Sequence, residues 1–173
     1  DVVVPRENVL VRGEEAFREH LRALNWERLS GAAQTNAIAL CALDRALSYS
    51  RDREQFGQPI GEFQGIEWKL ADMYKRVATS RALTYLSASS AIDRGEAPAP
   101  LETSAANLYA AEMAEEVVSE ALQIHGANGY QQGHPLEYLY RFARSYRIGG
   151  GTDEIMKNTI ARQLKKRGVP NLA

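Results

Sequence analysis

The residues best suited to bind an anion lie near the end of the chain, where Gly149, Gly150 and Gly151 precede Thr152 and Glu154. Consecutive glycines are expected where the backbone turns sharply or comes close to another group. The acidic first turn and basic last turn of the segment that follows predict a helix, which ends at a glycine and a proline. Free N–H groups at such a helix start suit a phosphate. A simple hinge between two helices is the alternative.

A second candidate is the carboxylate of Glu27, which stands beside Arg28 in a segment with helical periodicity. A carboxylate can act as a general base when it is held next to a substrate. On the residues alone, the simpler interpretation is that Glu27 complements the helix dipole and stays in solvent.

Two further segments carry polar residues among glycines. In the first, Arg53 can pair with a neighbouring carboxylate, and Phe56 can anchor in a core. In the second, His125 and Gly126 end a helix, with glycine as the expected C-cap. Neither segment has a metal-ligand spacing, and the chain contains no P-loop or internal repeat.

Helices must position these residues. Apolar residues recur at helical spacing in 14–25, in 26–51 with Asn25 as its N-cap, in 63–93, in 101–124 and in a short segment near 136–146. The charge order described above predicts a further helix over 152–167. Glycines and a proline predict an irregular loop over 51–61. Short connections favour antiparallel neighbours, so we predict an all-α, extended four-helix bundle with short flanking helices.

The composition sets further bounds. The 173 residues, 45% of them hydrophobic, suffice for one core, and a net charge of -1 argues against nucleic-acid binding. Cys41 is the only cysteine, so no internal disulfide can form. No apolar run is long enough to span a membrane, so we expect a soluble protein. The segment 1–13, with its valines cut short by Pro5, predicts a strand end, and we expect the chain to be part of a larger protein.

Three separated motifs together resemble the C-terminal half of the acyl-CoA dehydrogenases. They are Arg53-x-x-Phe56-Gly57-x-Pro59-Ile60, Gln123-Ile124-His125-Gly126-x-x-Gly129-Tyr130 and Ile148-Gly149-Gly150-Gly151-Thr152-x-Glu154-Ile155. The resemblance implies that residues 1–13 are the remnant of a middle β-domain and its linker, and that residues 14–173 form the C-terminal α-helical bundle domain. It also implies a homo-oligomer, a dimer or tetramer, with FAD bound across a subunit interface.

The resemblance also implies roles for individual residues. Arg53 and Phe56 match residues that hold the flavin nucleotide of a neighbouring subunit. Gln123, Gly126 and Ala127 match contacts near the pyrophosphate, although Ala127 replaces a more frequent glycine. Thr152 and Glu154 match contacts to the FAD of the same chain. Gly149, Gly150 and Gly151 match the substrate loop, and Arg28 matches an arginine near the CoA nucleotide.

In most members of that family the catalytic glutamate occupies the position of Gly150. The isovaleryl-CoA and long-chain type members instead place the base on a helix in a Glu-Arg-Leu sequence, which here is Glu27-Arg28-Leu29. The resemblance therefore implies that Glu27 takes the α-proton of an acyl-CoA while FAD accepts the β-hydrogen. An inactive homologue, or a subunit that borrows its site, is the other interpretation of Gly150.

The resulting prediction is an FAD-dependent acyl-CoA dehydrogenase that passes electrons to an electron-transfer flavoprotein, in the bacterial cytoplasm or the mitochondrial matrix. We expect the chain alone to be inactive and to bind FAD weakly or not at all. The alternatives are an acyl-CoA oxidase or flavin monooxygenase of the same fold, and a non-catalytic helical scaffold of a heteromeric complex.

Overall fold

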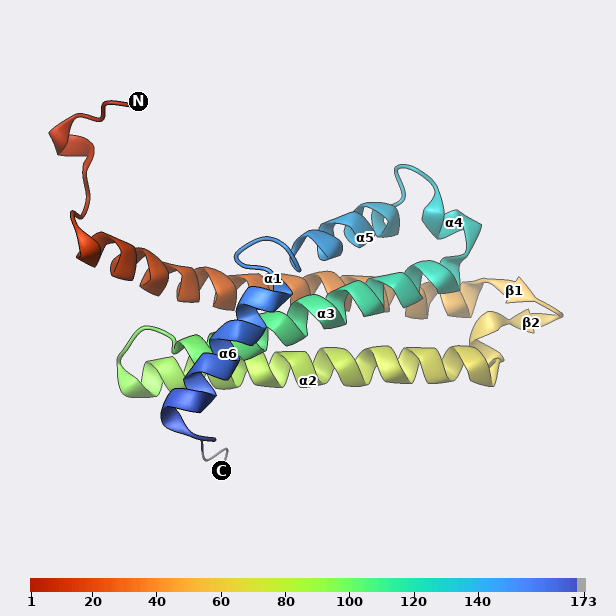
Figure 1. Cartoon of the computed structure of the whole chain (residues 1–173). Coiled ribbons are helices and arrows are strands. Elements are labelled where there is room, and N and C mark those ends of the chain that lie inside the picture. Colours follow the sequence, from red (N-terminus) through yellow and green to blue (C-terminus); the bar gives the residue numbers. More distant parts are fainter. Residues whose placement is uncertain (171–173) are drawn as a thin grey trace.

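Three long helices form the body of the molecule, as a computed structural model that describes residues 1–170 shows (Figure 1). They are α1 (Glu14–Asp52), α2 (Gln64–Arg94) and α3 (Pro100–His125). Three shorter helices follow: α4 (Ala127–Tyr130), α5 (Pro135–Ser145) and α6 (Asp153–Arg167). The predicted all-α, extended bundle with short flanking helices is confirmed. The last three residues of the predicted domain lie outside the described part of the chain.

The first two predicted helices are one continuous helix, so the prediction of an N-cap at Asn25 was wrong. Asn25 is buried inside α1, where its Oδ1 accepts a hydrogen bond from Nη1 of Arg28 at 3.4 Å. No glycine or proline interrupts the segment before Gly31, so nothing forces the helix to end there. The helix therefore runs on as far as Asp52.

The segment 51–61, predicted to be irregular, contains a small β-hairpin. Strand β1 (Glu54–Gln55) pairs antiparallel with β2 (Gln58–Pro59), and a 3-10 helix, Ile60–Glu62, follows. The two turn residues, Phe56 and Gly57, both have positive φ, at 55° and 84°. A two-residue turn with two positive φ angles matches the twist of a hairpin, so the two residues fold the chain back on itself.

The remaining helix ends follow the sequence closely. Gly95 ends α2 with φ 61°, and Gly126 ends α3 with φ 57°, which confirms its predicted C-cap role. The predicted loop after Gly126 contains the short α4. His134 then begins α5, with its Nδ1 accepting a hydrogen bond from the Leu136 N–H at 3.2 Å.

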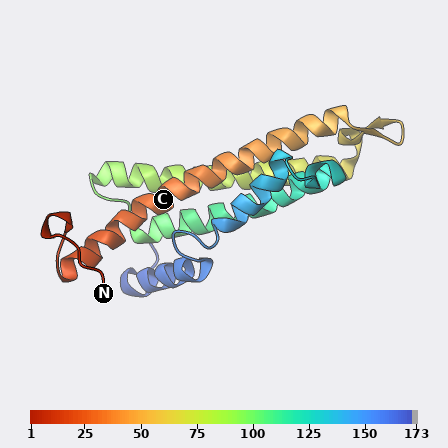
Figure 2. The same ribbon diagram turned by 90° about the horizontal axis from the view of Figure 1, so that it is seen from above.

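Helix α3 lies at the centre of the fold and contacts every other α-helix. It runs beside α1 and α2, α5 lies along its other side, and α6 crosses it steeply (Figures 1 and 2). Its small residues allow this close approach, because Ala110, Ala114 and Ala121 are fully buried. Val117 and Val118 occupy the middle of the core.

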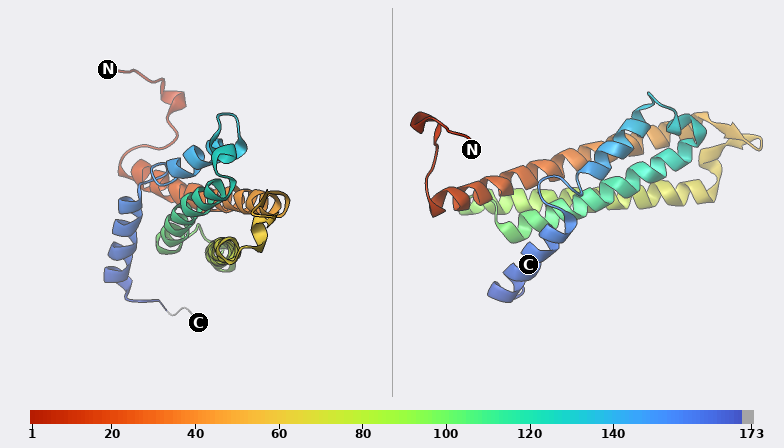
Figure 3. Two further views of the ribbon diagram at one scale, coloured as in Figure 1. Left: turned by 90° about the vertical axis from the view of Figure 1, so that its right-hand side faces the viewer. Right: turned by 45° about the horizontal axis from the view of Figure 1, so that its top comes forward.

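Residues 1–13 lead away from the bundle, as both views of Figure 3 show. Within the described residues this segment contains a 3-10 helix, Arg6–Asn8, and no strand. The expected strand end is therefore not formed here, since a strand needs a partner and the chain offers none at this point. No helix among residues 1–170 is long and apolar enough to cross a membrane.

Candidate functional site

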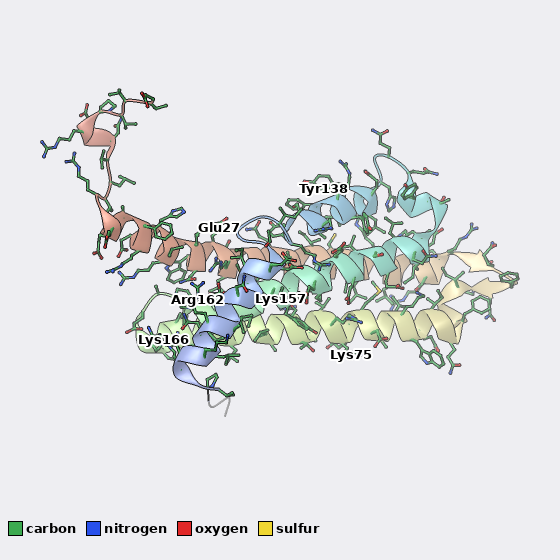
Figure 4. All side chains as sticks on the ribbon, in the orientation of Figure 1. Glu27, Lys75, Tyr138, Lys157, Arg162 and Lys166 are labelled. Carbon is green, nitrogen blue, oxygen red and sulfur yellow. The ribbon has the colours of Figure 1, made fainter. Side chains whose placement is uncertain are left out.

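The structure brings Glu27 close to the loop formed by residues 148–152, which we call the glycine loop. Gly150 lies in the loop between α5 and α6 with φ 68°, and a Cβ placed on it would lie 3.6 Å from Oε1 of Glu27. Figure 4 shows Glu27 on α1 beside this loop. A carboxylate on α1 thus stands next to the place that a side chain at position 150 would fill.

Glu27 and Gly150 line a cavity of about 280 Å³. Its wall is mixed: it contains the ring of Phe142 and a chain of hydrogen bonds. The Tyr146 hydroxyl donates to Oε1 of Gln34 at 2.7 Å, and Nε2 of Gln34 donates to Oγ of Ser30 at 3.2 Å. Glu27 itself is exposed, so a ligand can reach its carboxylate.

Arg28 faces the interior. Arg28 is only 8% exposed. Burial lowers the pKa of its guanidinium, and the charge of Glu27 opposes this effect. Nε of Arg28 donates to the Gly150 carbonyl oxygen at 3.4 Å, and the Arg28 carbonyl accepts from Nδ2 of Asn107 at 3.0 Å. In the described chain Arg28 therefore contacts the glycine loop.

The loop has little freedom at its two other glycines. Gly151 has φ 114°, and a Cβ there would lie 2.6 Å from Cε of Met156, which is 1% exposed. Gly149 donates its N–H to the Ser145 carbonyl at 2.9 Å. Close packing of the backbone, as predicted for a glycine run, thus accounts for Gly151.

Thr152 begins α6 as predicted, since its Oγ1 accepts a hydrogen bond from the Ile155 N–H at 3.4 Å. Glu154 is exposed in the first turn. The pKa of its carboxyl is lowered because it accepts hydrogen bonds from its own N–H and from Thr152. Both side chains are thus close to the free N–H groups of this helix start.

A second group of predicted residues meets at the opposite end of α1. Arg53, Gly126 and Ala127 line a cavity of about 270 Å³. Gln123 is exposed on the last turn of α3, and its carbonyl accepts the Gly126 N–H at 3.2 Å. Phe56, at the hairpin tip, does not line this cavity.

Phe56 is 94% exposed, so it is no core anchor within this chain. Its ring lies T-shaped to that of Phe63, with ring centroids 6.2 Å apart. The positive φ of Phe56 holds this apolar side chain at the tip of the hairpin, away from the bundle.

The sequence motifs did not predict a polar network that lines the second cavity. Tyr49 stacks on His125 with ring centroids 4.2 Å apart, and the Tyr49 hydroxyl accepts from Nδ2 of Asn128 at 2.9 Å. Nδ1 of His125 lies 2.8 Å from the Ala121 carbonyl oxygen. Tyr49 lies one helical turn before Arg53, which was the available signal, but only the fold shows that this face of α1 meets α3.

The two groups of residues cannot contact the same small ligand within one chain. Glu27 and Arg53 lie at the two ends of a continuous stretch of α1, about 39 Å apart at 1.5 Å per residue. The two groups therefore line separate cavities of the chain.

The comparisons with known proteins agree with this fold. Residues 17–165 match the family model described as "Acyl-CoA dehydrogenase, C-terminal domain". The chain is 42% identical over 166 residues to the probable acyl-CoA dehydrogenase YngJ of Bacillus subtilis, covering 96% of this chain and 43% of that protein. It is 41% identical over 163 residues to the mitochondrial isovaleryl-CoA dehydrogenase of Oryza sativa, covering 94% of this chain and 39% of that protein.

Among solved structures, butyryl-CoA dehydrogenase from Megasphaera elsdenii superposes with a TM-score of 0.87 at 34% identity. The match covers 94% of this chain and 42% of that chain. The chain thus spans about two-fifths of the length of the relatives it matches.

Proposed function

Because this chain belongs to the acyl-CoA dehydrogenase family and matches the C-terminal domain of its members, we propose that it takes part in an FAD-dependent α,β-dehydrogenation of an acyl-CoA thioester, with Glu27 as the base. One observation carries the proposal: Oε1 of Glu27 lies 3.6 Å from the position of a Cβ on Gly150. The Glu27 carboxylate on α1 can therefore reach the same face of a substrate as a side chain at position 150 would.

The residues present fit FAD. The cavity at Arg53 combines a guanidinium, which forms charge-assisted hydrogen bonds to phosphate, with the small residues Gly126 and Ala127, which let the backbone come close. The start of α6 at Thr152 offers free N–H groups. We propose that Arg53, Phe56, Gln123, Gly126 and Ala127 hold the FAD of a neighbouring subunit.

We propose that Thr152 and Glu154 contact the FAD of their own chain. A homo-oligomer, a dimer or tetramer, follows from this division. An electron-transfer flavoprotein is the proposed acceptor of the electrons.

Glu27 would remove the proton from the α-carbon of the thioester, becoming a neutral carboxylic acid. FAD, when bound, supplies the acceptor for the β-hydrogen and its electron pair. The loss of both hydrogens leaves a double bond between the α- and β-carbons. Arg28 and Asn107 would keep Glu27 in place, since they tie this turn of α1 to the glycine loop and to α3.

The test is Glu27→Gln in the complete enzyme, because glutamine keeps the shape of the side chain and cannot take a proton. We expect kcat to fall by about 10²–10⁴-fold, the usual contribution of a positioned base, with FAD content unchanged. Exchange of the α-proton of an acyl-CoA with solvent deuterium should stop as well. Unchanged turnover in the variant would show that Glu27 is not the base.

A further inference from the structure

The glycine loop is bracketed by a charged cluster that lies outside the cavity of Glu27. Arg147, directly before the loop, donates from Nε to Oδ2 of Asp153, directly after it, at 2.7 Å, with Nη2 at 2.6 Å from the same oxygen. Nη1 of Arg147 donates to Oε2 of Glu115 on α3 at 2.7 Å. We call Glu115, Arg147 and Asp153 the arginine clamp.

The clamp joins the two ends of the glycine loop. Besides the side-chain contacts, the Asp153 N–H donates to the Arg147 carbonyl at 3.3 Å, so residues 148–152 form a closed turn. The Asp153 side chain is 8% exposed and that of Glu115 is 20% exposed. Hydrogen bonds to Glu115 and then to Asp153 raise the pKa of the Arg147 guanidinium.

The third member, Glu115, connects the loop to the buried centre of the fold. Glu115 lies on α3, whose neighbouring side chains Ala114 and Val117 are fully buried. Its second oxygen, Oε1, lies 3.6 Å from Nε of Arg144 on α5. The clamp thus links α3, α5 and the start of α6, while Arg147 does not line the cavity that contains Glu27 and Gly150.

We propose that Arg147 is a positioning residue of the dehydrogenation: held by Glu115 and Asp153, it fixes the loop so that Gly150 stays opposite Glu27. The inference rests on the proposed function and adds to it residues that do not touch the substrate. A displacement of about 1 Å at a reacting centre can cost as much as 10²-fold in rate. The two ends of the loop therefore need to be held in fixed positions.

The test uses Arg147→Gln and Asp153→Asn in the complete enzyme, which remove the charge and keep a polar side chain. The matched control is Arg141→Gln, because Arg141 is also an arginine of this region whose ion pair, with Glu137 at 2.8 Å, is exposed and does not touch the loop. The first measurement is hydrogen exchange at the Gly149 and Asp153 amides, which donate to the Ser145 and Arg147 carbonyls.

Both clamp variants should exchange these amides about tenfold faster than the wild type and the control, because the closed turn opens more often. In turnover, kcat should fall about tenfold with little change in KM or FAD content. The double variant should lose no more than the worse single variant, since the two residues act as one pair.

A deuterium isotope effect separates positioning from mere stability. With an α-deuterated acyl-CoA, a misplaced loop makes proton removal slower relative to the other steps, so the isotope effect on kcat should rise in the clamp variants. An unchanged isotope effect with a parallel loss of bound FAD would show a purely structural role and overturn the proposal. Unchanged amide exchange would overturn it too, whether or not the enzyme turns over.

The two proposals fail in different ways. A wild-type enzyme that does not dehydrogenate any acyl-CoA would remove the proposed function, and the catalytic meaning of the clamp with it. Active wild-type enzyme with fully active clamp variants would overturn the clamp alone.

Discussion

Glu27 and Gly150 come from segments far apart in the sequence, and their meeting depends on single contacts. Arg28 holds the Gly150 carbonyl from one side, and Met156 packs against Gly151 from the other. The sequence motifs predicted that the two positions complement each other. Only the fold shows that a Cβ at position 150 would lie within van der Waals contact of the Glu27 carboxylate.

Moving the carboxylate from α1 to the loop tests this meeting. Gly150→Glu combined with Glu27→Gly should keep some turnover, about a hundredth to a tenth of the wild type, whereas Glu27→Gly alone should lose about 10²–10⁴-fold. The loss in the double variant has a physical cause, because φ 68° at position 150 strains any residue other than glycine by about 1 kcal/mol. The measurement is kcat with a saturating acyl-CoA. A double variant as inactive as Glu27→Gly would mean that the two positions do not serve one substrate atom.

Gly151 should be the least replaceable glycine of the loop. Gly151→Ala places a Cβ 2.6 Å from Cε of the buried Met156 and strains a backbone with φ 114°, so we expect about 2–4 kcal/mol lower free energy of unfolding. Gly57→Ala is the control, since Gly57 also has positive φ, 84°, but nothing lies within 4 Å of its Cβ position. That variant should lose only about 1 kcal/mol. Equal losses in urea unfolding would exclude the contact with Met156 as the cause.

At the scale of elements, local signals located most helix ends. Pro100, Gly126 and Thr152 mark the starts or ends of helices as their chemistry predicts. Asn25 misled the prediction because an asparagine also suits a helix interior when a buried donor, here Arg28, bonds to its amide oxygen. The hairpin at Phe56 was missed because a phenylalanine with positive φ is uncommon.

Helix α3 carries the contacts that no local pattern reveals. Its outer face bears carboxylates that pair with arginine and lysine side chains on its neighbours. These pairs join Glu120 to Lys69 and Glu116 to Arg76 on α2, Glu115 to Arg147, and Glu112 to Lys157 on α6. Each pair is partly exposed and contributes little alone. Together they orient three neighbouring segments around one helix.

The end of α3 should make stability depend on pH. Burial lowers the pKa of His125 below its ordinary 6.5, so the folded chain binds a proton less readily than the unfolded chain. Stability is therefore fully present above about pH 6.5 and falls as the pH decreases below it, by at most about 1.4 kcal/mol per pH unit. His125→Asn should flatten this slope in urea unfolding between pH 7.5 and 5.5. His20→Asn, at an exposed position, is the control variant. An equal slope in wild type and His125→Asn would contradict the assignment.

At the scale of the whole molecule, the length of α1 decides how a flavin site can be built. Glu27 lies on α1 and Arg53 is the C-cap of that helix, so the continuous helix keeps them about 39 Å apart. The predicted helix 26–51 already implied this separation, because the wrongly predicted break at Asn25 lies before Glu27. The continuous helix favours sites shared between two copies of the chain.

Mixing two inactive variants tests such sharing. Glu27→Gln removes the base from every site, and Arg53→Ala weakens FAD binding at every site, so each homo-oligomer should be inactive. In a dimer of one chain of each kind, one site receives Glu27 and Arg53 from two different chains and is intact. Random pairing gives mixed dimers in half of the molecules with one intact site of two, hence about a quarter of the wild-type activity.

Co-expression of both chains with different affinity tags, followed by sequential purification, isolates the mixed dimers, which should reach about half of the wild-type activity. If both residues served a site within one chain, no mixture would recover activity, and a Glu27→Gln chain paired with a second Glu27→Gln chain provides that baseline.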